Sequence, residues 1–264
     1  MQMRPEWEGD PGEVQTCGPG FIARTRLVER IVREIRPATL LDIGCGRGNV
    51  TRLLAPYTRS TVASEITPED ARLAAETLAA MANVQVLAAD VLALDGTRQV
   101  PLSGAFDMVA LSEVLEHVDD DATALTRCYA LLRPGGRLLV TVPAHPDLWT
   151  AMDELIGHRR RYTRETLTFR LQDAGFRIER FLSWGFPITG FLAHRAQRLR
   201  ASRLRASAGG GASLGVPRPL VPIATFLFHA AARVEGVFAG TDRGLGYVVV
   251  ARRPEEPAQA ARAA

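Results

Sequence analysis

The chain has 264 residues, of which 47% are hydrophobic and 23% are charged, and its formal net charge is +3. This length suits one large domain, or one domain with an appendage, and it can bury a full core without disulfide bonds. The three cysteines are too scattered for a disulfide framework or a zinc site, which favours a reducing, cytoplasmic compartment. All 32 cationic residues are arginine, but so small a net charge does not indicate a nucleic-acid partner. No apolar run reaches the about 18 residues of a membrane-spanning helix, and we expect no secretory signal.

Helix-like and strand-like segments alternate along the chain. Apolar residues recur at helical spacing in residues 21–36, and Pro37 ends that helix. Residues 38–44 follow as a short apolar run typical of a buried strand. Residues 134–136, Pro-Gly-Gly, predict a turn, and Thr163 is a candidate helix cap. The other expected elements are helices at 49–55, 68–81, 121–132 and 164–174, and strands at 60–65, 84–88, 106–111, 137–142, 176–182 and 247–251.

This alternation predicts βαβ units and a mainly parallel, doubly wound α/β sheet with helices on both faces. Ligands of such sheets bind beyond the carboxyl ends of the strands. The residues that carry the chemistry are therefore expected at those strand ends.

Residues 184–244 interrupt the alternation. They contain an arginine-rich helix candidate at 187–206, a Gly- and Ser-rich linker, and a strongly apolar stretch at 219–232 that is too short to span a bilayer. We expect this helical insertion to be a lid over an apolar acceptor, a peripheral membrane or lipid contact, or a homodimer contact. For the apolar stripe within it, ordinary packing against the sheet is the favoured explanation; the stripe comprises Ile223, Phe226, Leu227, Ala230 and Val234. The expected organisation is a flexible N-terminus (1–20), a core domain (21–183), the insertion (184–244), a last core strand (245–252) and a flexible tail (253–264).

A glycine-rich loop, Gly44-Cys45-Gly46-Arg47-Gly48, follows the first strand and opens a helix. Glycine lets the backbone approach a ligand closely, and the following helix presents free N–H groups. Asp42 ends the strand before this loop, where it would accept a hydrogen bond from a ligand ammonium group or fix the loop.

Two acids end the next two strands. Glu65 lies about 20 residues beyond the loop, which is the usual position of a partner for a ribose diol. Asp90 would accept from an adenine amino group, with Val91 packing on the ring. A dinucleotide-binding loop would need a third glycine where Asn49 stands. The pattern therefore favours an adenosine with an amino-acid tail over a pyrophosphate.

Five motifs occur in a known order: LLDIGCGRG, SEIT, AAD, FDMVALSEVLEHV and LLRPGGRLLVTVP. Over residues 38–180, and again at the final strand, the chain resembles the class I S-adenosylmethionine-dependent methyltransferases. The resemblance implies a seven-stranded sheet whose last strand is antiparallel, with S-adenosylmethionine as the methyl donor. The donor-binding residues expected on this basis are Asp42, Gly44, Cys45, Gly46, Glu65, Ile66, Asp90, Val91 and Ser112.

Glu113, Glu116 and His117 follow the fourth strand. If helical, these positions share one face, where they would deprotonate an acceptor, bind a metal ion, or form a buried histidine held by acids. The motif is similar to that of the ubiquinone-pathway O-methyltransferases, and this similarity implies the first two roles. We expect no metal here and take His117 as a candidate base, since histidine titrates near neutral pH.

A second group of titratable residues follows the fifth strand. His145, His158 and Tyr162 are the candidate catalytic residues in it, within a VPAHP…GHRRRY pattern that resembles an acceptor-facing loop of bacterial methyltransferases. The arginines at 159–161 would hold an anionic acceptor, or else be solvated or pair with Asp147, Asp153 and Glu154.

The sequence thus predicts methyl transfer from S-adenosylmethionine to a small-molecule acceptor that is partly apolar and anionic. The alternatives are methylation of a prenyl or lipid phosphate, a nicotinamide-dependent oxidoreductase, and a non-catalytic donor-binding protein. Whether oxygen, nitrogen or carbon receives the methyl group stays open.

Overall fold

The structure is a computed structural model that describes residues 19–90, 104–192, 195 and 221–255. It contains one seven-stranded sheet with the strand order β3-β2-β1-β4-β5-β7-β6. Strand β7 is antiparallel to both of its neighbours, and the other pairings are parallel. The strands are β1 (Thr39–Ile43), β2 (Ser60–Glu65), β3 (Val84–Ala88), β4 (Phe106–Ser112), β5 (Leu132–Pro143), β6 (Arg177–Trp184) and β7 (Gly246–Arg252). The predicted fold class is confirmed.

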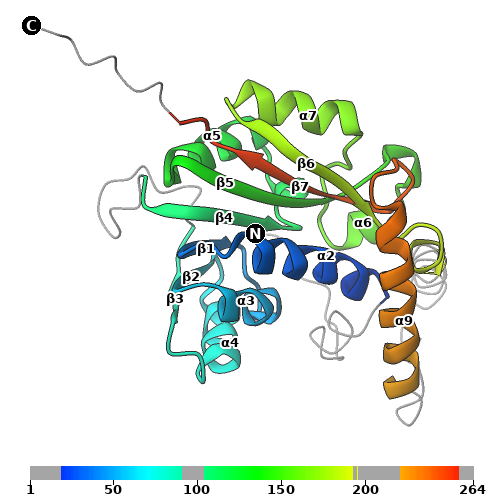
Figure 1. Ribbon diagram of the computed structural model, residues 1–264, viewed down its shortest axis with the longest axis horizontal. Coiled ribbons are helices and arrows are strands. Elements are labelled where there is room, and N and C mark those ends of the chain that lie inside the picture. The colour runs from blue at the N-terminus through cyan, green and yellow to red at the C-terminus, as the bar shows by residue number, and fades with distance from the viewer. Residues whose placement is uncertain (1–18, 91–103, 193–194, 196–220, 256–264) are drawn as a thin grey trace, which may run out of the picture.

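Helices cover both faces of the sheet (Figure 1). They are α2 (Pro19–Ile35), α3 (Asn49–Leu54), α4 (Pro68–Leu78), α5 (Asp121–Leu131), α6 (Ala151–Leu155), α7 (Arg164–Asp173) and α9 (Val221–Glu235). Short 3-10 turns lie at η1 (Ala55–Tyr57), η2 (Leu115–His117), η3 (Pro146–Leu148) and η5 (Gly236–Phe238). No helix in the described ranges is long and apolar enough to cross a membrane.

The central strands are apolar along their length because side chains from both of their faces are buried. Leu41 and Val109 point into a core that includes residues of α5 and α7. Their neighbours Leu40 and Met108 point to the opposite face, where they pack against α2. Successive side chains of a strand point to opposite faces of the sheet. A continuous apolar run therefore indicates a strand that is covered on both faces.

The helix starts follow the capping chemistry of the sequence. Thr163 accepts a hydrogen bond from the Thr166 N–H, as predicted, and Asp120 does the same for Thr123 at the start of α5. Each cap satisfies an N–H group that has no partner inside its helix. Helix α4 ends at Leu78, three residues earlier than expected.

Strand β5 is longer than predicted. The expected turn at 134–136 lies within it, because Leu132 already pairs with Phe106 and the register then shifts before Met108. Gly135, at φ +79°, supplies the backbone conformation that this irregularity requires.

The segment between β5 and α7 folds back onto the strand ends. Arg161 makes two hydrogen bonds with Asp153, of 2.9 and 3.0 Å, and donates a third to the Ala144 carbonyl. Asp153 also accepts from the Thr150 N–H, which caps α6. Both charged side chains are buried, so this pair holds α6 and the residues after it beside β5.

The predicted insertion and termini are described only in part. Helix α9 overlaps the apolar stretch and extends three residues beyond it. The expected packing of its apolar stripe against the sheet is wrong for Phe226, Leu227 and Val234, which are exposed. Residues 196–206 of the arginine-rich helix candidate lie outside the described residues. Residues 1–18 and 256–264 of the expected flexible ends also lie outside them.

Arg161→Met is expected to lower the free energy of unfolding by about 3–5 kcal/mol, because it leaves the Asp153 carboxylate buried without its partner. Urea unfolding measures this. Arg137, which pairs with Glu179 in a partly exposed bridge, provides the control, and Arg137→Met should cost less than about 1 kcal/mol. Equal effects of the two substitutions would contradict this role of Arg161.

Candidate active site

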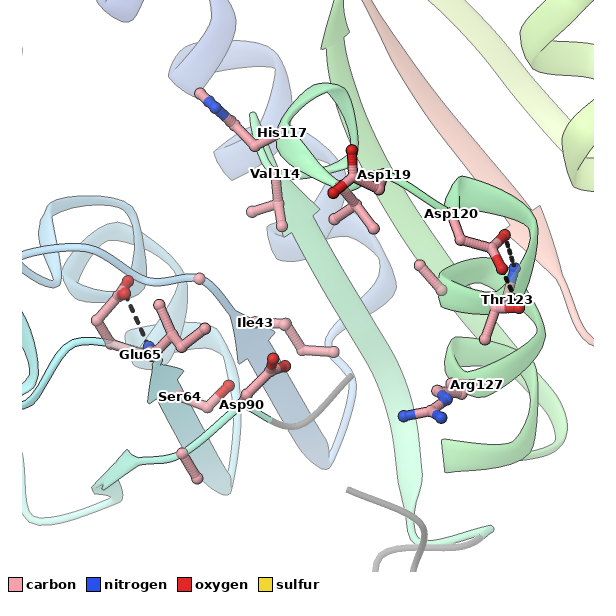
Figure 2. A pocket seen from close by; sticks show the side chains of 15 residues that line it. Ile43, Ser64, Glu65, Asp90, Val114, His117, Asp119, Asp120, Thr123 and Arg127 are labelled. Carbon is pink, nitrogen blue, oxygen red and sulfur yellow. Dashed lines mark hydrogen bonds between the residues drawn. The ribbon is translucent and has the colours of Figure 1, made fainter. Parts of the chain in front are cut away.

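A cavity of about 550 Å³ lies at the carboxyl ends of β1, β2 and β4, beside the start of α5. Figure 2 shows Glu65 and Asp90 on one side of it and Thr123 and Arg127 of α5 on the other. Its lining is Ile43, Gly44, Ser64, Glu65, Ile66, Ala89, Asp90, Val114, His117, Val118, Asp119, Asp120, Thr123, Ala124 and Arg127. The cavity occupies the place where sheets of this kind bind ligands.

Carboxylates dominate the charge of this cavity. Its lining includes Glu65, Asp90, Asp119 and Asp120 but one arginine, Arg127. Such a lining favours a cationic ligand and disfavours a pyrophosphate. S-adenosylmethionine carries a sulfonium and an ammonium group, so the residues present fit this donor better than they fit a nicotinamide dinucleotide.

The glycine-rich loop and Glu65 lie in direct contact. Glu65 Oε2 accepts from the Gly46 N–H at 2.9 Å, and Glu65 Oε1 accepts from the Ile66 N–H at 2.8 Å. Gly44 and Cys45 both donate to the Ser64 carbonyl. These contacts fix the loop against the end of β2, with Glu65 oriented by the backbone.

Two loop glycines meet different surroundings. Gly44 has φ +69°, and a Cβ there would lie 2.7 Å from Val114 Cγ2. Gly46 has φ +54°, and a Cβ there would meet nothing within 4 Å. A side chain at position 44 would therefore collide with Val114. A side chain at position 46 would extend into the open space beside Glu65.

Asp42 holds the glycine-rich loop through a hydrogen bond with Thr51 of the helix that follows the loop. Its carboxylate is buried and accepts from the Thr51 hydroxyl at 2.6 Å, which joins the end of β1 to α3. Burial raises the pKa of Asp42 to about 6, against the opposing effect of the Thr51 hydrogen bond. Of its two predicted roles, this geometry favours fixing the loop.

The expectation that Glu113, Glu116 and His117 share one helical face is wrong. Glu113 has φ +57°, and only the short turn η2 follows it. Glu113 consequently points to Arg24 of α2, at 2.9 Å, while Glu116 is fully buried and His117 lines the cavity. Glu113 therefore pairs with α2, whereas Glu116 and His117 stay close to each other and to His158.

His117 and His158 lie edge to face, with ring centroids 4.8 Å apart. His117 Nδ1 is 3.2 Å from the Gly157 carbonyl oxygen, and His158 Nδ1 is 2.8 Å from Asp153 Oδ1. Desolvation, together with the neighbouring His158, lowers the pKa of His117. At neutral pH the His117 ring is therefore uncharged and able to accept a proton.

Glu116 is a buried carboxyl group without a hydrogen-bond partner on either oxygen. Its Oε1 lies 3.7 Å from His158 Nε2. Burial, reinforced by Glu113, raises the pKa of Glu116 well above its usual range. Ligand atoms of Glu116, His117 and His158 all lie within 4.8 Å of one another, so this trio is the group in the described chain that could hold a metal ion.

Asp153, which sequence reasoning treated only as a neighbouring acid, orients His158. Burial alone would raise the Asp153 pKa, but hydrogen bonds from His158 and Arg161 outweigh it and hold the pKa below its usual range. The pattern Thr150-x-x-Asp153, typical of a helix start, was the available signal. Nothing local indicated that Arg24 reaches Glu113.

The remaining predicted site residues lie in different places. Ile66 lines the cavity, and Ser112 lies 3.4 Å from the Thr141 hydroxyl at the end of β4. Tyr162 is buried in the core, where its hydroxyl donates to Asp121, and His145 packs against the Tyr247 ring. Val91 lies outside the described residues.

The arginines proposed to hold an anionic acceptor are ion-paired. Arg159 pairs with Asp119 at 2.7 Å, Arg160 with Asp121 at 3.1 Å, and Arg161 with Asp153. The arginines pair with acids, which was the alternative expectation. Asp119 and Asp121 are not among the acids expected, whereas Asp153 is.

Comparisons with known proteins agree with this geometry. A family model described as a methyltransferase domain matches residues 21–180. A ubiquinone biosynthesis O-methyltransferase of Parvibaculum lavamentivorans is 25% identical over 202 residues, covering 71% of this chain and 78% of that protein. A protein of the same name from Xanthomonas oryzae pv. oryzae is 32% identical over 111 residues, but the match spans only 41% of this chain and 44% of that protein.

Solved structures share the fold. The N-methyltransferase NodS from Bradyrhizobium japonicum WM9, in complex with S-adenosyl-L-homocysteine, aligns over 94% of both chains with a TM-score of 0.59 and 16% identity. The [4+2]-cyclase SpnF aligns with a TM-score of 0.60 and 22% identity, over 95% of this chain and 86% of that one. At these identities the likeness concerns the fold alone.

A seven-stranded sheet with β7 antiparallel, a glycine loop bound to a strand-end acid and an acid-lined cavity together define a class I S-adenosylmethionine-dependent methyltransferase. The family model covers more than half of the chain, so the chain belongs to the methyltransferase domain family, with S-adenosylmethionine as its donor.

Gly46→Leu is expected to weaken S-adenosylmethionine binding tenfold or more, because its side chain enters the open space beside Glu65. Gly104 provides a matched control, since it also has a left-handed φ, +68°, and open space around it. Gly104→Leu should cost similar stability, about 1–2 kcal/mol, and leave binding unchanged. Calorimetric titration and thermal unfolding separate the two effects. Unaltered donor affinity in Gly46→Leu would contradict the assigned donor site.

Asp42→Asn is expected to become more stable relative to the wild type as pH rises. The folded-state pKa, about 6, lies above the unfolded value of about 3.9, so the wild type loses stability as pH rises through about 6. The amide keeps an oxygen for the Thr51 hydroxyl but does not titrate. Between pH 5 and 7.5 the difference in unfolding free energy should grow by about 1.4 kcal/mol. Urea titrations at both pH values measure it, and a constant difference would refute the assignment.

Proposed function

We propose that the chain methylates a hydroxyl group of a small, partly apolar molecule. The observation that carries this proposal is an uncharged histidine, His117, at the wall of the acid-lined cavity. The names of the relatives above, which are O-methyltransferases of ubiquinone biosynthesis, support an oxygen acceptor and a small molecule.

The donor side uses the strand-end acids. When bound, S-adenosylmethionine supplies a methyl group on a sulfonium centre. Glu65 would accept from the ribose hydroxyls, because each carboxylate oxygen keeps a lone pair beyond its bond to a backbone N–H. Asp90 would hold the adenine, and the negative lining offsets the positive charge of the donor.

The acceptor side uses His117 as the base. If its Nδ1–H donates to the Gly157 carbonyl, Nε2 carries the free lone pair and removes the proton from the acceptor hydroxyl. The lowered pKa of His117 keeps this nitrogen unprotonated at neutral pH. His158, held by Asp153, packs on His117 and limits its orientation. This arrangement gives the second histidine a positioning role.

Methylation of a prenyl or lipid phosphate has less support. It would need cations available to the acceptor, and Arg159, Arg160 and Arg161 are each paired with an acid. A nicotinamide-dependent reaction is disfavoured by the acid lining of the cavity. The fold does not fix the reaction, since the structural relative SpnF is named a cyclase.

Transfer of labelled methyl from S-adenosylmethionine to a panel of phenols and catechols tests the proposal. His117→Asn is expected to lower kcat by about 10²–10⁴-fold with unchanged donor affinity, because it removes the base. The wild-type rate should fall as acidification protonates His117, and this fall should be absent in the variant.

His229→Asn is the control, since His229 also has a lowered pKa but lies on α9 against Arg26. Its rate should equal that of the wild type. A rate that vanishes on chelation and returns with Mg²⁺ or Mn²⁺ would assign the deprotonation to a metal ion. Label transferred to amines but to no hydroxyl compound would refute the oxygen acceptor.

A further inference from the structure

One side of α9 is apolar and exposed. Phe226, Leu227 and Val234 are 69%, 58% and 57% exposed, and Val237 in η5 is 83% exposed. Phe226, Ala230 and Val234 are spaced by one helical turn and therefore form a single stripe. We name this stripe, with Val237, the α9 face.

The opposite side of α9 is packed. Ala232 contacts the core cluster that includes α2, and His229 Nδ1 lies 2.6 Å from Arg26 Nη1. Figure 1 shows α9 at one side of the molecule, against the end of α2. The α9 face is thus the outer side of a helix that is already anchored.

A second exposed apolar group adjoins this helix. Ile188, Phe191 and Leu192 are exposed, and the N–H groups of Ile188 and Thr189 both donate to the buried Glu235 carboxylate at the end of α9. These hydrogen bonds place the two apolar groups on neighbouring elements.

The charges around the α9 face are positive. Arg233 is exposed on α9, Arg195 stacks 5.5 Å from the Phe191 ring centroid, and Arg243 stacks 5.7 Å from that of Phe186. Between Glu179 and Glu235 the sequence contains eight arginines and no Asp or Glu. Arginine beside exposed aromatic and aliphatic residues is the composition of a helix that lies in a lipid headgroup layer.

We propose that the α9 face docks onto the surface of a bilayer containing anionic phospholipids. Its apolar side chains would enter the headgroup boundary and its arginines would contact lipid phosphates. No described helix could span the bilayer, so the helix would lie on the surface. A second copy of the chain is a poorer occupant, because a two-fold contact would bring the like-charged arginines of both copies together.

Co-sedimentation of the full chain with vesicles, without S-adenosylmethionine, tests this proposal separately from methyl transfer. Binding is expected to phosphatidylcholine vesicles that contain phosphatidylglycerol, and to fall with added salt. The double variant Phe226→Ser, Val237→Ser should bind about tenfold or more weakly at unchanged net charge. Arg233→Gln with Arg243→Gln should reduce the preference for anionic lipid.

Phe169→Ser is the matched control, because Phe169 is 61% exposed on α7. It should bind vesicles like the wild type, and thermal unfolding should show all variants folded. Equal binding to pure phosphatidylcholine, or binding unaffected by the Phe226 and Val237 changes, would overturn the proposal. A dimer detected by light scattering that the double variant dissociates, without vesicle binding, would assign the face to a second copy.

Discussion

The carboxylate of Glu65 accepts a hydrogen bond from the Gly46 N–H, and the proposed donor site depends on this contact. It joins the loop after β1 to the end of β2, so that a flexible glycine backbone and an acidic side chain hold each other in place. The Ile66 N–H binds the second oxygen, which leaves the carboxylate little freedom to rotate. A ligand that meets this site encounters an acceptor already oriented, and ordering it on binding costs little entropy.

The proposed acceptor side is organised differently. There, one buried acid joins two side chains as well as a backbone amide: Asp153 accepts from the Thr150 N–H and contacts His158 and Arg161. This arrangement places His158 between His117 and the unpartnered carboxyl group of Glu116. A buried group without a partner destabilises a fold, and a cost retained beside the proposed base is typical of a functional site.

Much of the fold could be predicted because local patterns carried it. Short apolar runs predicted the positions of the strands, and Thr163 predicted the start of α7. The contact between residues 44–48 and Glu65 followed from parallel pairing of β1 and β2. The grouping of Glu116 with His158 could not be predicted from local patterns, because it depends on how residues 144–162 return to the strand ends. The helical face expected at 113–117 failed because Glu113 adopts a positive φ that no residue pattern announced.

The insertion between β6 and β7 begins and ends at neighbouring points. Trp184, the last residue of β6, pairs with Gly246, the first of β7, and the Leu245 N–H donates to the Trp184 carbonyl. In the order of the strands, the insertion is therefore a connection between two neighbouring antiparallel strands. Such a connection can change in length without changing the strand order, so whatever the insertion contributes can vary independently of the glycine loop at the other end of the sheet.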